Sequence, residues 1–479
     1  MRDGSFSVSK SSGHLWSVDF RGLFRQEHGV SLPAAAKAVA ILLQIMGGYM
    51  AGDTASLFSA HGRETVVAIA GVQFGWGSVG KLAAVMDVLS ARHGDRLGFV
   101  GLASTLGRPV LGAHPVDAWL DVPADDEELA RLVAAHRITA ALVVLDPELA
   151  SRLQSVGVPV VYLDSLPFLW TDRDELPVDV EAYCAQVCPV LPRACWPSLR
   201  RIRSLHWVGP VVGMTGDGGP APVAGRAVLN LGGLESPFRD GGDDAYLSLV
   251  LESALTALRD RGFREVTITG NVDLDRLPRT SARTGLTITG GRLPRGEFLE
   301  ALRTAELVVT SPGRTTLLET AALDQRCVVL PPQNLSQIAN AADVAAQVDP
   351  AIVVGWPADV VDEAVLDTHK SRGEAEAVRY LYGRIAAAAA RCSMYGPWLT
   401  ARLSEAIGAS GRPGARMAPF SGPTGGDGAA EVADIVDTVV RRIRTRLPGV
   451  RLPAPATFPM QQQLSDAREM ETYAHAASR

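Results

Sequence analysis

The feature that most constrains this chain is a series of short apolar runs, each followed by a turn and a helix-like stretch. The first run, Thr65–Phe74 (TVVAIAGVQF), is unbroken and β-branched at its start, which is typical of a strand buried on both faces. Strands that alternate with helices predict a parallel α/β sheet. Further strands are predicted at 97–102, 140–145, 158–163, 227–231, 265–269, 286–289, 307–310 and 327–330, and helices at 81–93, 126–136, 244–260, 296–303, 316–323 and 336–348.

Two Gly/Pro-rich segments divide this pattern, and we interpret both as linkers, the second of them mobile. The alternation restarts after the first linker, so two α/β domains are expected in tandem. Residues 1–63 lack a strand-rich run and are interpreted as an extension that holds one helix. The predicted organisation is an extension (1–63), a first domain (64–208), a linker (209–225), a second domain (226–408), a second linker (409–429) and a C-terminal helix with a tail (430–479).

Composition excludes several classes of protein. The 479 residues are 47% apolar with a net charge of −6, which excludes a wholly disordered chain and lacks the basic footprint of a nucleic-acid binder. Five cysteines are too few for a disulfide framework, and Cys184, Cys188 and Cys195 lack the paired spacing of a zinc site. No apolar stretch approaches the roughly 18 residues of a membrane span. We therefore expect a cytoplasmic protein without a metal.

The strongest candidate site is Val308–Glu319 (VVTSPGRTTLLE), a predicted strand, a tight turn and a helix start. This arrangement aims backbone N–H groups and the helix dipole at an anion. The hydroxyls of Thr315 and Thr316 can bond phosphate oxygens, and the carboxylate of Glu319 can hold a ribose diol. The alternative is an ordinary capped helix, with Ser311 or Thr315 as the cap and Glu319 as its partner.

The next segment, Val328–Asn340 (VVLPPQNLSQIAN), repeats the strand–turn–helix pattern and carries four amides. They are Gln333, Asn334, Gln337 and Asn340. Amides both donate to and accept from sugar hydroxyls, so two successive units with polar edges predict one crevice for a nucleotide and a sugar. The alternative is a solvated loop and helix face.

In the first domain, Gly75–Lys81 (GWGSVGK) follows the first strand and opens a helix. The segment fits the phosphate-binding pattern G-x-x-x-x-G-K, but Leu82 stands where a Ser or Thr would hold Mg²⁺, which leaves a P-loop hydrolase as a minor alternative. Trp76 either stacks on an aromatic acceptor or packs against the linker. The candidate acceptor contacts here are Gly75, Trp76, Gly77 and Ser78.

The segment Val161–Asp174 (VYLDSLPFLWTDRD) holds the candidate general base. A predicted strand ends at Asp164, where a carboxylate is placed to take a proton from an acceptor, and Asp146 is held in reserve. The alternative for Asp164 is a turn or helix-cap role. Phe168 and Trp170 follow on the loop and either stack an acceptor or fill the core beneath it. The D-x-D at the end of the segment is interpreted as a charged turn.

Together, the segments 311–319 and 332–340 resemble the donor-binding signature of GT-B glycosyltransferases, H-G-G-x-G-T-x-x-E followed by P-x-x-x-D-Q-x-x-N. The matching residues are Gly313, Thr316, Glu319, Pro332, Gln337 and Asn340, and the departures are Ser311 at the His, Pro312 and Thr315 at Gly positions, and Ser336 at the Asp. The resemblance implies two Rossmann-like domains facing a cleft. It also implies a C-terminal helix, here Glu431–Arg446, that crosses back to the first domain.

The same resemblance implies roles for individual residues: ribose binding by Glu319, diphosphate binding by Thr316 and donor-sugar contact by Gln337. Arg314 is expected to replace the missing His at the pyrophosphate. The candidate donor-binding residues are Gly233, Ser311, Gly313, Arg314, Thr315, Thr316, Glu319, Gln333, Asn334 and Gln337.

With GWGSVGK, YLDSLPFLWT and YCAQ added, the chain is similar to the cytosylglucuronate synthase family and its relatives in nucleoside-antibiotic pathways. This implies metal-independent, inverting transfer of a sugar from a UDP-sugar such as UDP-glucuronate to cytosine or a related base, with no other cofactor. Arg314 and Arg239 are candidates for the donor carboxylate. Two alternatives share the fold: a nucleotide-sugar epimerase, and a non-catalytic nucleotide-sugar-binding protein.

Overall fold

A computed structural model describes residues 7–10, 16–19, 63, 65–72, 74, 76–102, 107–112, 114–213, 220–234, 245–275, 277, 285–421 and 427–445. The chain divides into two compact units, Met1–His61 and Gly62–Arg479. In the first unit, β1 (Ser7–Lys10) pairs antiparallel with β2 (Trp16–Asp19). These strands correct the expectation of an extension without strands, since runs of four residues are too short to show a clear period. The helix expected in this segment lies outside the described residues.

The second unit begins with a seven-stranded parallel sheet in the order β5-β4-β3-β6-β7-β8-β9. Its strands are β3 (Thr65–Gly71), β4 (Leu97–Leu102), β5 (Val116–Leu120), β6 (Ala140–Val144), β7 (Val160–Asp164), β8 (Ala182–Gln186) and β9 (Leu205–Val208). Its helices are α2 (Gly77–His93), α3 (Arg108–Leu111), α4 (Asp126–Ala135), α5 (Pro147–Ser155) and α6 (Trp196–Arg200), with 3-10 turns at Gly94–Arg96 and Arg193–Cys195.

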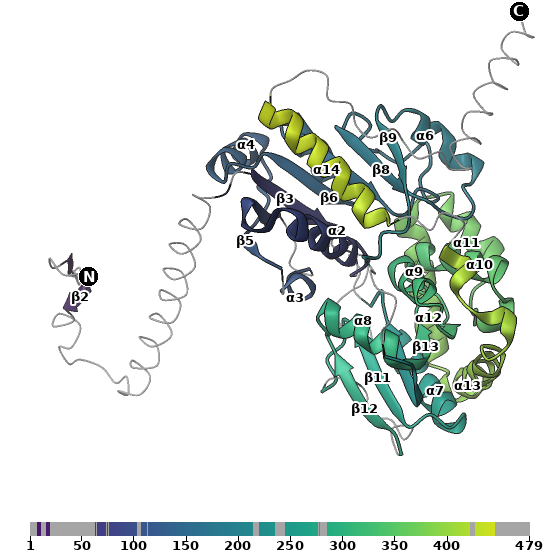
Figure 1. Cartoon of the computed structure of the whole chain (residues 1–479). Helices are drawn as coiled ribbons and strands as arrows, with labels where there is room; N and C mark the ends of the chain where they lie inside the picture. The colour runs from purple at the N-terminus through teal and green to yellow at the C-terminus, as the bar shows by residue number, and fades with distance from the viewer. Residues whose placement is uncertain are drawn as a thin grey trace, which may run out of the picture. The chain divides into compact units, whose positions relative to one another are not determined.

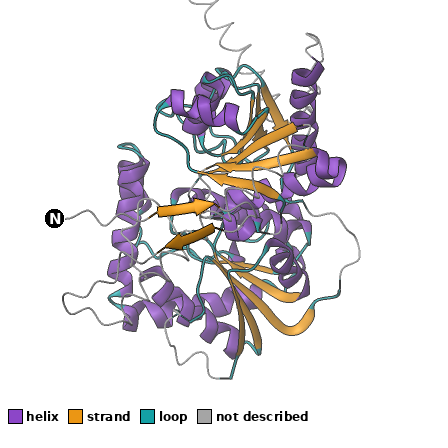
Figure 2. Ribbon diagram, turned by 90° about the vertical axis from the view of Figure 1, so that its left-hand side faces the viewer, coloured by secondary structure: helices purple, strands orange, loops and turns teal. Residues whose placement is uncertain are grey.

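A five-stranded parallel sheet follows in the order β12-β11-β10-β13-β14. Its strands are β10 (Val223–Leu231), β11 (Glu265–Gly270), β12 (Thr287–Gly291), β13 (Ala305–Thr310) and β14 (Cys327–Val329). Its helices are α7 (Ala245–Asp260), α8 (Arg295–Thr304), α9 (Arg314–Ala322), α10 (Leu335–Gln347), α11 (Glu363–Lys370), α12 (Glu374–Ala389) and α13 (Cys392–Ala409), with 3-10 turns at Pro350–Ile352, Pro413–Ala415 and Ala418–Ser421. Helices lie on both faces of the parallel sheets (Figure 2).

Both sheets begin with the strand order 3-2-1-4-5, the doubly wound order of Rossmann-like domains. The order reverses between β3 and β6 in the first sheet and between β10 and β13 in the second. In open α/β sheets, ligands bind at the carboxyl ends of the strands that flank such a reversal. The topology therefore points to the loops after β3 and β6, and to those after β10 and β13.

The last described helix, α14 (Gly428–Thr445), returns to the first domain, as the resemblance implied (Figure 1). Val432, Ile435 and Val439 are buried in one cluster with α2 and the strands of the first sheet. Polar contacts flank this seam: Arg92 on α2 bonds Asp434 and Asp437 of α14 at 2.8 and 3.1 Å. Two segments of the chain therefore connect the domains, one between β9 and β10 and the other between α13 and α14.

The second predicted linker is not a mobile segment over its described part. Ala415, Met417 and Phe420 are each at most 1% exposed and pack against α9 and α10 in one cluster. Their burial shows that apolar residues spaced through a Gly/Pro-rich stretch tie it to the core. In the first linker, Val211 is fully buried, and the strand β10 starts at Val223, inside the predicted linker.

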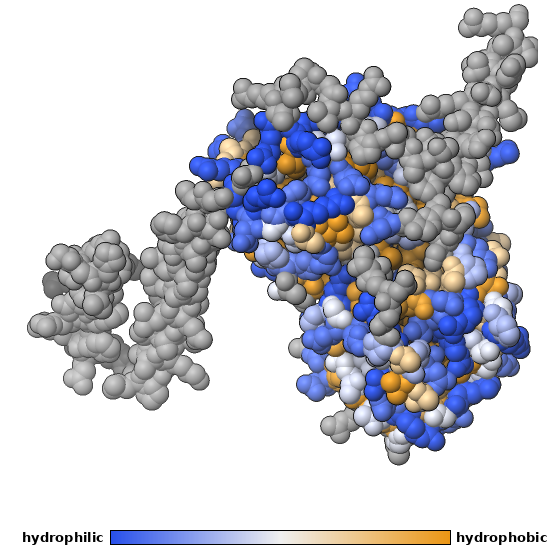
Figure 3. All heavy atoms as spheres, viewed as in Figure 1, coloured by the Kyte–Doolittle hydropathy of each residue, from blue (hydrophilic) through white to orange (hydrophobic). Residues whose placement is uncertain are grey.

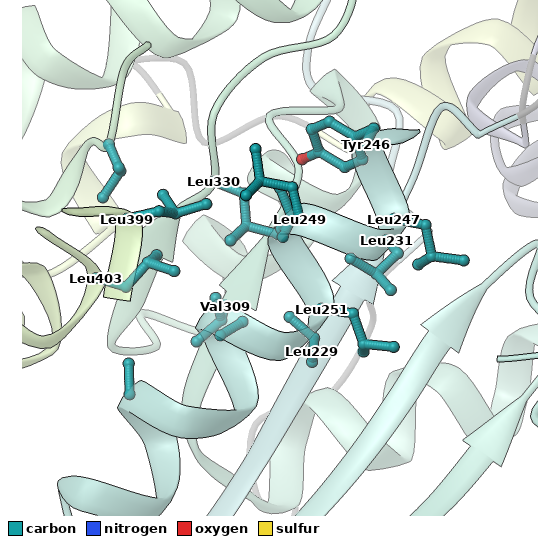
Figure 4. Packing of buried hydrophobic residues seen from close by; sticks show 14 of the residues in the cluster. Leu229, Leu231, Tyr246, Leu247, Leu249, Leu251, Val309, Leu330, Leu399 and Leu403 are labelled. Atoms are coloured by element: carbon teal, nitrogen blue, oxygen red, sulfur yellow. The ribbon is translucent and has the colours of Figure 1, made fainter. Parts of the chain in front are cut away.

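The core of the second domain lies between its sheet and the helices α7 and α13. Leu229 on β10 faces Leu251 of α7, and Leu399 and Leu403 of α13 close the cluster (Figure 4). On the surface, apolar residues appear as scattered patches among hydrophilic ones in the view of Figure 3. In the part of the chain that the structure describes, no helix is long and apolar enough to cross a membrane.

Candidate functional site

The first turns of α2 and α9 meet directly, which brings the carboxyl edges of the two sheets together (Figure 1). Lys81 Nζ of α2 donates to Thr315 Oγ1 of α9 at 2.5 Å. The Thr315 hydroxyl in turn donates to the carbonyl of Gly77 at 3.1 Å. Both contacts join residues that follow β3 and β13, which are interior strands of the two sheets, so the predicted donor and acceptor segments are neighbours in the fold.

Helix α9 begins with a first turn that no side chain caps. Its N-cap is Gly313, without a side-chain hydrogen bond, and the helix starts at Arg314. The alternative of an ordinary capping box is therefore wrong, because neither Ser311 nor Thr315 is the cap and Glu319 bonds another residue. The backbone N–H groups of an uncapped first turn and the helix dipole form a favourable site for an anion.

A polar network lies beneath this turn at the point where the strand order reverses. Asn230 of β10 donates to Thr310 Oγ1 at 3.0 Å and to Thr316 Oγ1 at 3.3 Å, and accepts from Thr269 Oγ1 at 3.1 Å. Asn230 is 6% exposed. Sequence reasoning missed this residue, and its one weak signal was a lone amide in an apolar strand that leads into Gly232-Gly233.

The amides of the second motif are buried, so their interpretation as a solvated face is wrong. Gln333 and Gln337 both donate to the carbonyl of Gly232, at 2.8 and 3.2 Å, and Gln337 Oε1 accepts from the Gln333 backbone N–H at 2.9 Å. Asn334 caps α10 by accepting from the Gln337 backbone at 3.0 Å. Gly233 lies against these amides with φ +83°. This cluster shapes the loop after β10.

Glu319 is 1% exposed and carries charge contacts from two other elements. Its Oε1 accepts from Arg295 Nη1 of α8 at 2.8 Å, while its Oε2 has no hydrogen-bond partner among the described residues. Burial raises the pKa of the Glu319 carboxyl, and Arg295 and Lys81 oppose the rise. Arg295, which the sequence analysis did not single out, also donates to the carbonyl of Val212 in the linker.

Arg314 turns away from the start of its own helix. It donates to the carbonyl of Val187 in the first domain at 3.2 Å and to Asp343 at 3.4 Å. Its guanidinium lies 4.9 Å from the ring centre of Phe420 and 5.9 Å from that of Phe168. Through the bond to Val187, Arg314 forms a second polar link between the domains. Its role at the pyrophosphate stays a prediction.

The Gly-rich segment of the first domain is helical rather than a phosphate loop. Helix α2 begins at Gly77, four residues before the predicted start, and the Gly80 backbone donates to the Trp76 carbonyl at 2.9 Å. Lys81 therefore lies inside the helix and contacts Thr315, which removes the loop that a P-loop hydrolase needs. Trp76 is partly buried against the first-domain core, and Gly75 lies outside the described residues.

Asp164 is fully buried under the loop that carries the two predicted aromatics. It accepts from Trp170 Nε1 at 2.6 Å, from Tyr183 Oη at 2.7 Å and from the Leu166 backbone at 2.8 Å. Burial raises its pKa to about 6. Phe168 packs into the core with the same loop. This geometry fits the turn-holding and core-filling alternatives, and the catalytic and stacking roles stay predictions.

Other predicted residues take structural positions. Asp146 caps α5 by accepting from the Leu149 backbone at 3.0 Å. In the D-x-D, Asp174 accepts from the Thr171 hydroxyl at 2.8 Å, as a charged turn does. Ser311 is fully buried, and Ser78 donates to the Val72 carbonyl at 3.1 Å. Within the described residues, no group of three or more His, Cys, Asp or Glu side chains is arranged to hold a metal ion.

No described protein family and no curated protein sequence matches the chain. Among solved structures, a spinosyn rhamnosyltransferase complexed with thymidine diphosphate is 16% identical, covering 72% of this chain and 96% of its own, with a TM-score of 0.43. A UDP-glucosyltransferase from Polygonum tinctorium is 12% identical over 80% and 99%, with a TM-score of 0.44. A putative UDP-N-acetylglucosamine 2-epimerase from Listeria monocytogenes is 11% identical over 83% and 100%, with a TM-score of 0.46.

Proposed function

We propose that this chain is a glycosyltransferase of the GT-B type, which moves a sugar from a UDP-sugar to a small acceptor without a metal ion. The observation that carries the proposal is the uncapped first turn of α9. This turn lies at the strand-order reversal of one Rossmann-like sheet and contacts the first turn of α2, which follows an interior strand of the other. Such a junction offers one anion-binding turn between two domains.

The residues around this turn match the needs of sugar transfer. The departing diphosphate gains from backbone N–H groups and from the Thr316 hydroxyl, which stabilise charge without a cation. The amides of Gln333 and Gln337, held on the loop at Gly232, are the groups proposed to orient the donor sugar. Glu319 Oε2, which has no partner in the described part, is the proposed acceptor for a ribose hydroxyl.

For the substrates, we propose UDP-glucuronate as the donor and cytosine or a related base as the acceptor. This rests on the similarity of the segments GWGSVGK, YLDSLPFLWT and YCAQ to the cytosylglucuronate synthase family. Trp76 is the partly buried aromatic nearest in sequence to the junction between α2 and α9, and it supports stacking of a flat acceptor there. Transfer with inversion at the anomeric carbon accompanies this proposal.

The function is tested by incubating the protein with UDP-sugars, with and without cytosine, and following the products by mass spectrometry. The expected result is UDP release together with a new glycoside, only when the acceptor is present. A changed nucleotide sugar without an acceptor would instead identify an epimerase. Saturable donor binding without turnover would identify a binding protein, and either outcome replaces the transferase proposal.

The variant Asp164→Asn distinguishes a structural role of Asp164 in the loop from a role as the general base. We expect a loss of stability of about 1–3 kcal/mol, because an amide has a single acceptor oxygen and cannot accept from Trp170 and Tyr183 on one side and from the Leu166 backbone on the other. The pKa of Asp164 is raised from 3.8 to about 6 in the folded state, so this carboxyl makes wild-type protein less stable as pH rises through that window. Unfolding in urea at pH 4 and pH 7 should show a smaller loss of stability with rising pH in Asp164→Asn than in wild-type protein, while other carboxyls with a raised pKa, such as Asp343, keep part of the slope in both.

A different pair of results would identify Asp164 as the base. Asp164→Asn would then keep its stability, and the acidic limb that wild-type kcat/KM shows near pH 6, the folded-state pKa, would be absent from the variant. Asp146→Asn is the matched control, since Asp146 caps α5 with one carboxylate oxygen at the end of the neighbouring strand β6.

A further inference from the structure

Lys81 is a buried ammonium group that the proposed chemistry does not use. It lies in α2, is 1% exposed, and its Nζ donates to Thr315 Oγ1 across the domain junction at 2.5 Å. Because the same hydroxyl donates to the Gly77 carbonyl at 3.1 Å, α2 engages Thr315 as both acceptor and donor. One side chain in the first turn of α9 is therefore held by two groups of the other domain.

The glycines of α2 make this contact possible. A Cβ added at Gly77 would stand 3.4 Å from Thr315 Oγ1, and one at Gly80 would stand 3.3 Å from Thr315 Cγ2. A Cβ at Gly80 would therefore require Thr315 to shift by a few tenths of an ångström, whereas one at Gly77 would make an ordinary contact. The spacing G-S-V-G-K thus places Lys81 one turn beyond Gly77 and next to Gly80, and all three lie against the same threonine.

Burial and the charges around Lys81 set the pKa of its ammonium group. Burial lowers the pKa of Lys81 to about 7, Glu319 opposes this, and Arg314 and Arg295 add to it. A buried ion pair seldom stabilises a fold more than apolar packing of the same volume would. Burial of the Lys81 ammonium costs desolvation free energy. The hydrogen bond that the ammonium makes to Thr315 explains this burial better than packing of the apolar stem does.

We propose that Lys81 is a positioning residue for the donor: from the first domain it holds Thr315, and thereby sets the orientation of the first turn of α9 with Thr316 and Glu319. This inference rests on the proposed function, because the turn that Lys81 holds is the one proposed to receive the donor diphosphate. Lys81 itself touches no reacting atom in this scheme; it keeps the donor site of one domain in register with the other.

The test is Lys81→Met, which keeps the apolar stem and removes the ammonium. Donor KM and kcat are measured by UDP release from pH 6 to pH 9, with saturating acceptor. We expect donor KM to rise about tenfold or more while kcat changes much less. In wild-type protein the donor KM should rise above pH 7, as Lys81 loses its proton and its attraction to Glu319, and this limb should be absent in Lys81→Met.

Two further variants separate positioning from packing. Thr315→Val removes the hydroxyl at constant volume and should mimic Lys81→Met, whereas Thr315→Ser keeps the hydroxyl and should lose less. Arg92→Gln, which breaks an ion pair between α2 and α14 outside the site, should leave both kinetic constants near their wild-type values. Unchanged donor KM and an unchanged pH profile in Lys81→Met would overturn the inference.

The failure of this inference is distinguishable from failure of the proposed function. If the wild-type enzyme is active and Lys81→Met has the same donor KM and pH profile, only the inference is overturned. If the wild-type protein neither binds UDP in calorimetry nor consumes UDP-sugars, the proposed function is overturned. The contact has a readout that needs no substrate. In urea unfolding, the losses of Lys81→Met and Thr315→Val should be less than additive in the double variant, because both remove the Lys81–Thr315 bond and Thr315→Val alone also removes the bond to the Gly77 carbonyl. Fully additive losses would overturn the contact.

Discussion

Glu319→Ala is expected to raise the donor KM by about 10- to 100-fold, the effect of losing a hydrogen bond to a charged group. The same change should lower the free energy of unfolding by about 3–5 kcal/mol, because it leaves Arg295 buried without its carboxylate partner. Lys81 loses its opposing charge as well. Both measurements are available on one sample, by UDP-release kinetics and by urea unfolding.

Controls assign these two effects to separate causes. Glu319→Gln keeps the volume and an oxygen for Arg295, so we expect most of the stability to return while the donor KM stays raised. Adding Lys81→Met to Glu319→Ala removes one of the stranded cations and should recover part of the stability without restoring the KM. If the Glu319→Ala variant had the wild-type donor KM, the assignment of Glu319 to the donor site would be wrong.

Gly233→Ala is the second change with a large expected effect. Gly233 has φ +83°, where a side chain costs about 1–2 kcal/mol, and an added Cβ would stand 2.5 Å from Gln337 Nε2. The amide would have to leave the Gly232 carbonyl, which it bonds at 3.2 Å. Because Gln337 is a proposed contact of the donor sugar, we expect the donor KM to rise about tenfold.

Gly232→Ala provides a matched control one residue away. Its added Cβ would meet only Asn230 Nδ2, at 3.8 Å, which is an ordinary contact. We therefore expect Gly232→Ala to keep a donor KM near the wild-type value, measured with the same UDP-sugar as for Gly233→Ala. Equal losses in the two variants would show that the loop tolerates no side chain at either position, and that the Gln337 amide is not the cause.

Much of the architecture follows from local pattern. All of the predicted strands are present, and most are apolar runs that a parallel sheet buries on both faces, although the edge strand β12 keeps its threonines exposed. The strands β5, β8 and β9 were not predicted. β8 (Ala182–Gln186) is fully buried but carries a Tyr, a Cys and a Gln, and β9 (Leu205–Val208) begins with a Leu-His pair. Short strands with such mixed residues give no clear period.

The place of the candidate site was predicted by motif, but the contacts within it were not foreseen. The donor segment does open a helix at the carboxyl end of β13, as the spacing predicted. Arg295 and Asn230 were missed, because an arginine in an Arg-rich chain and one amide in an apolar strand carry little local signal. Arg314 was expected at the pyrophosphate, and its position against Val187 and Phe420 depends on two segments far away in sequence.

The return of α14 to the first domain was an expectation drawn from the resemblance to GT-B glycosyltransferases. The sequence by itself determined most of the elements and their parallel pairing, and it predicted the place of the candidate site. Those features depend on hydrophobic period, glycine turns and strand–helix alternation, which are local along the chain. Only the tertiary structure decided which groups face one another. Lys81 meets Thr315 over a separation of 234 residues. Desolvation and charge pairing at that distance depend on the packed fold, and no local pattern encodes them.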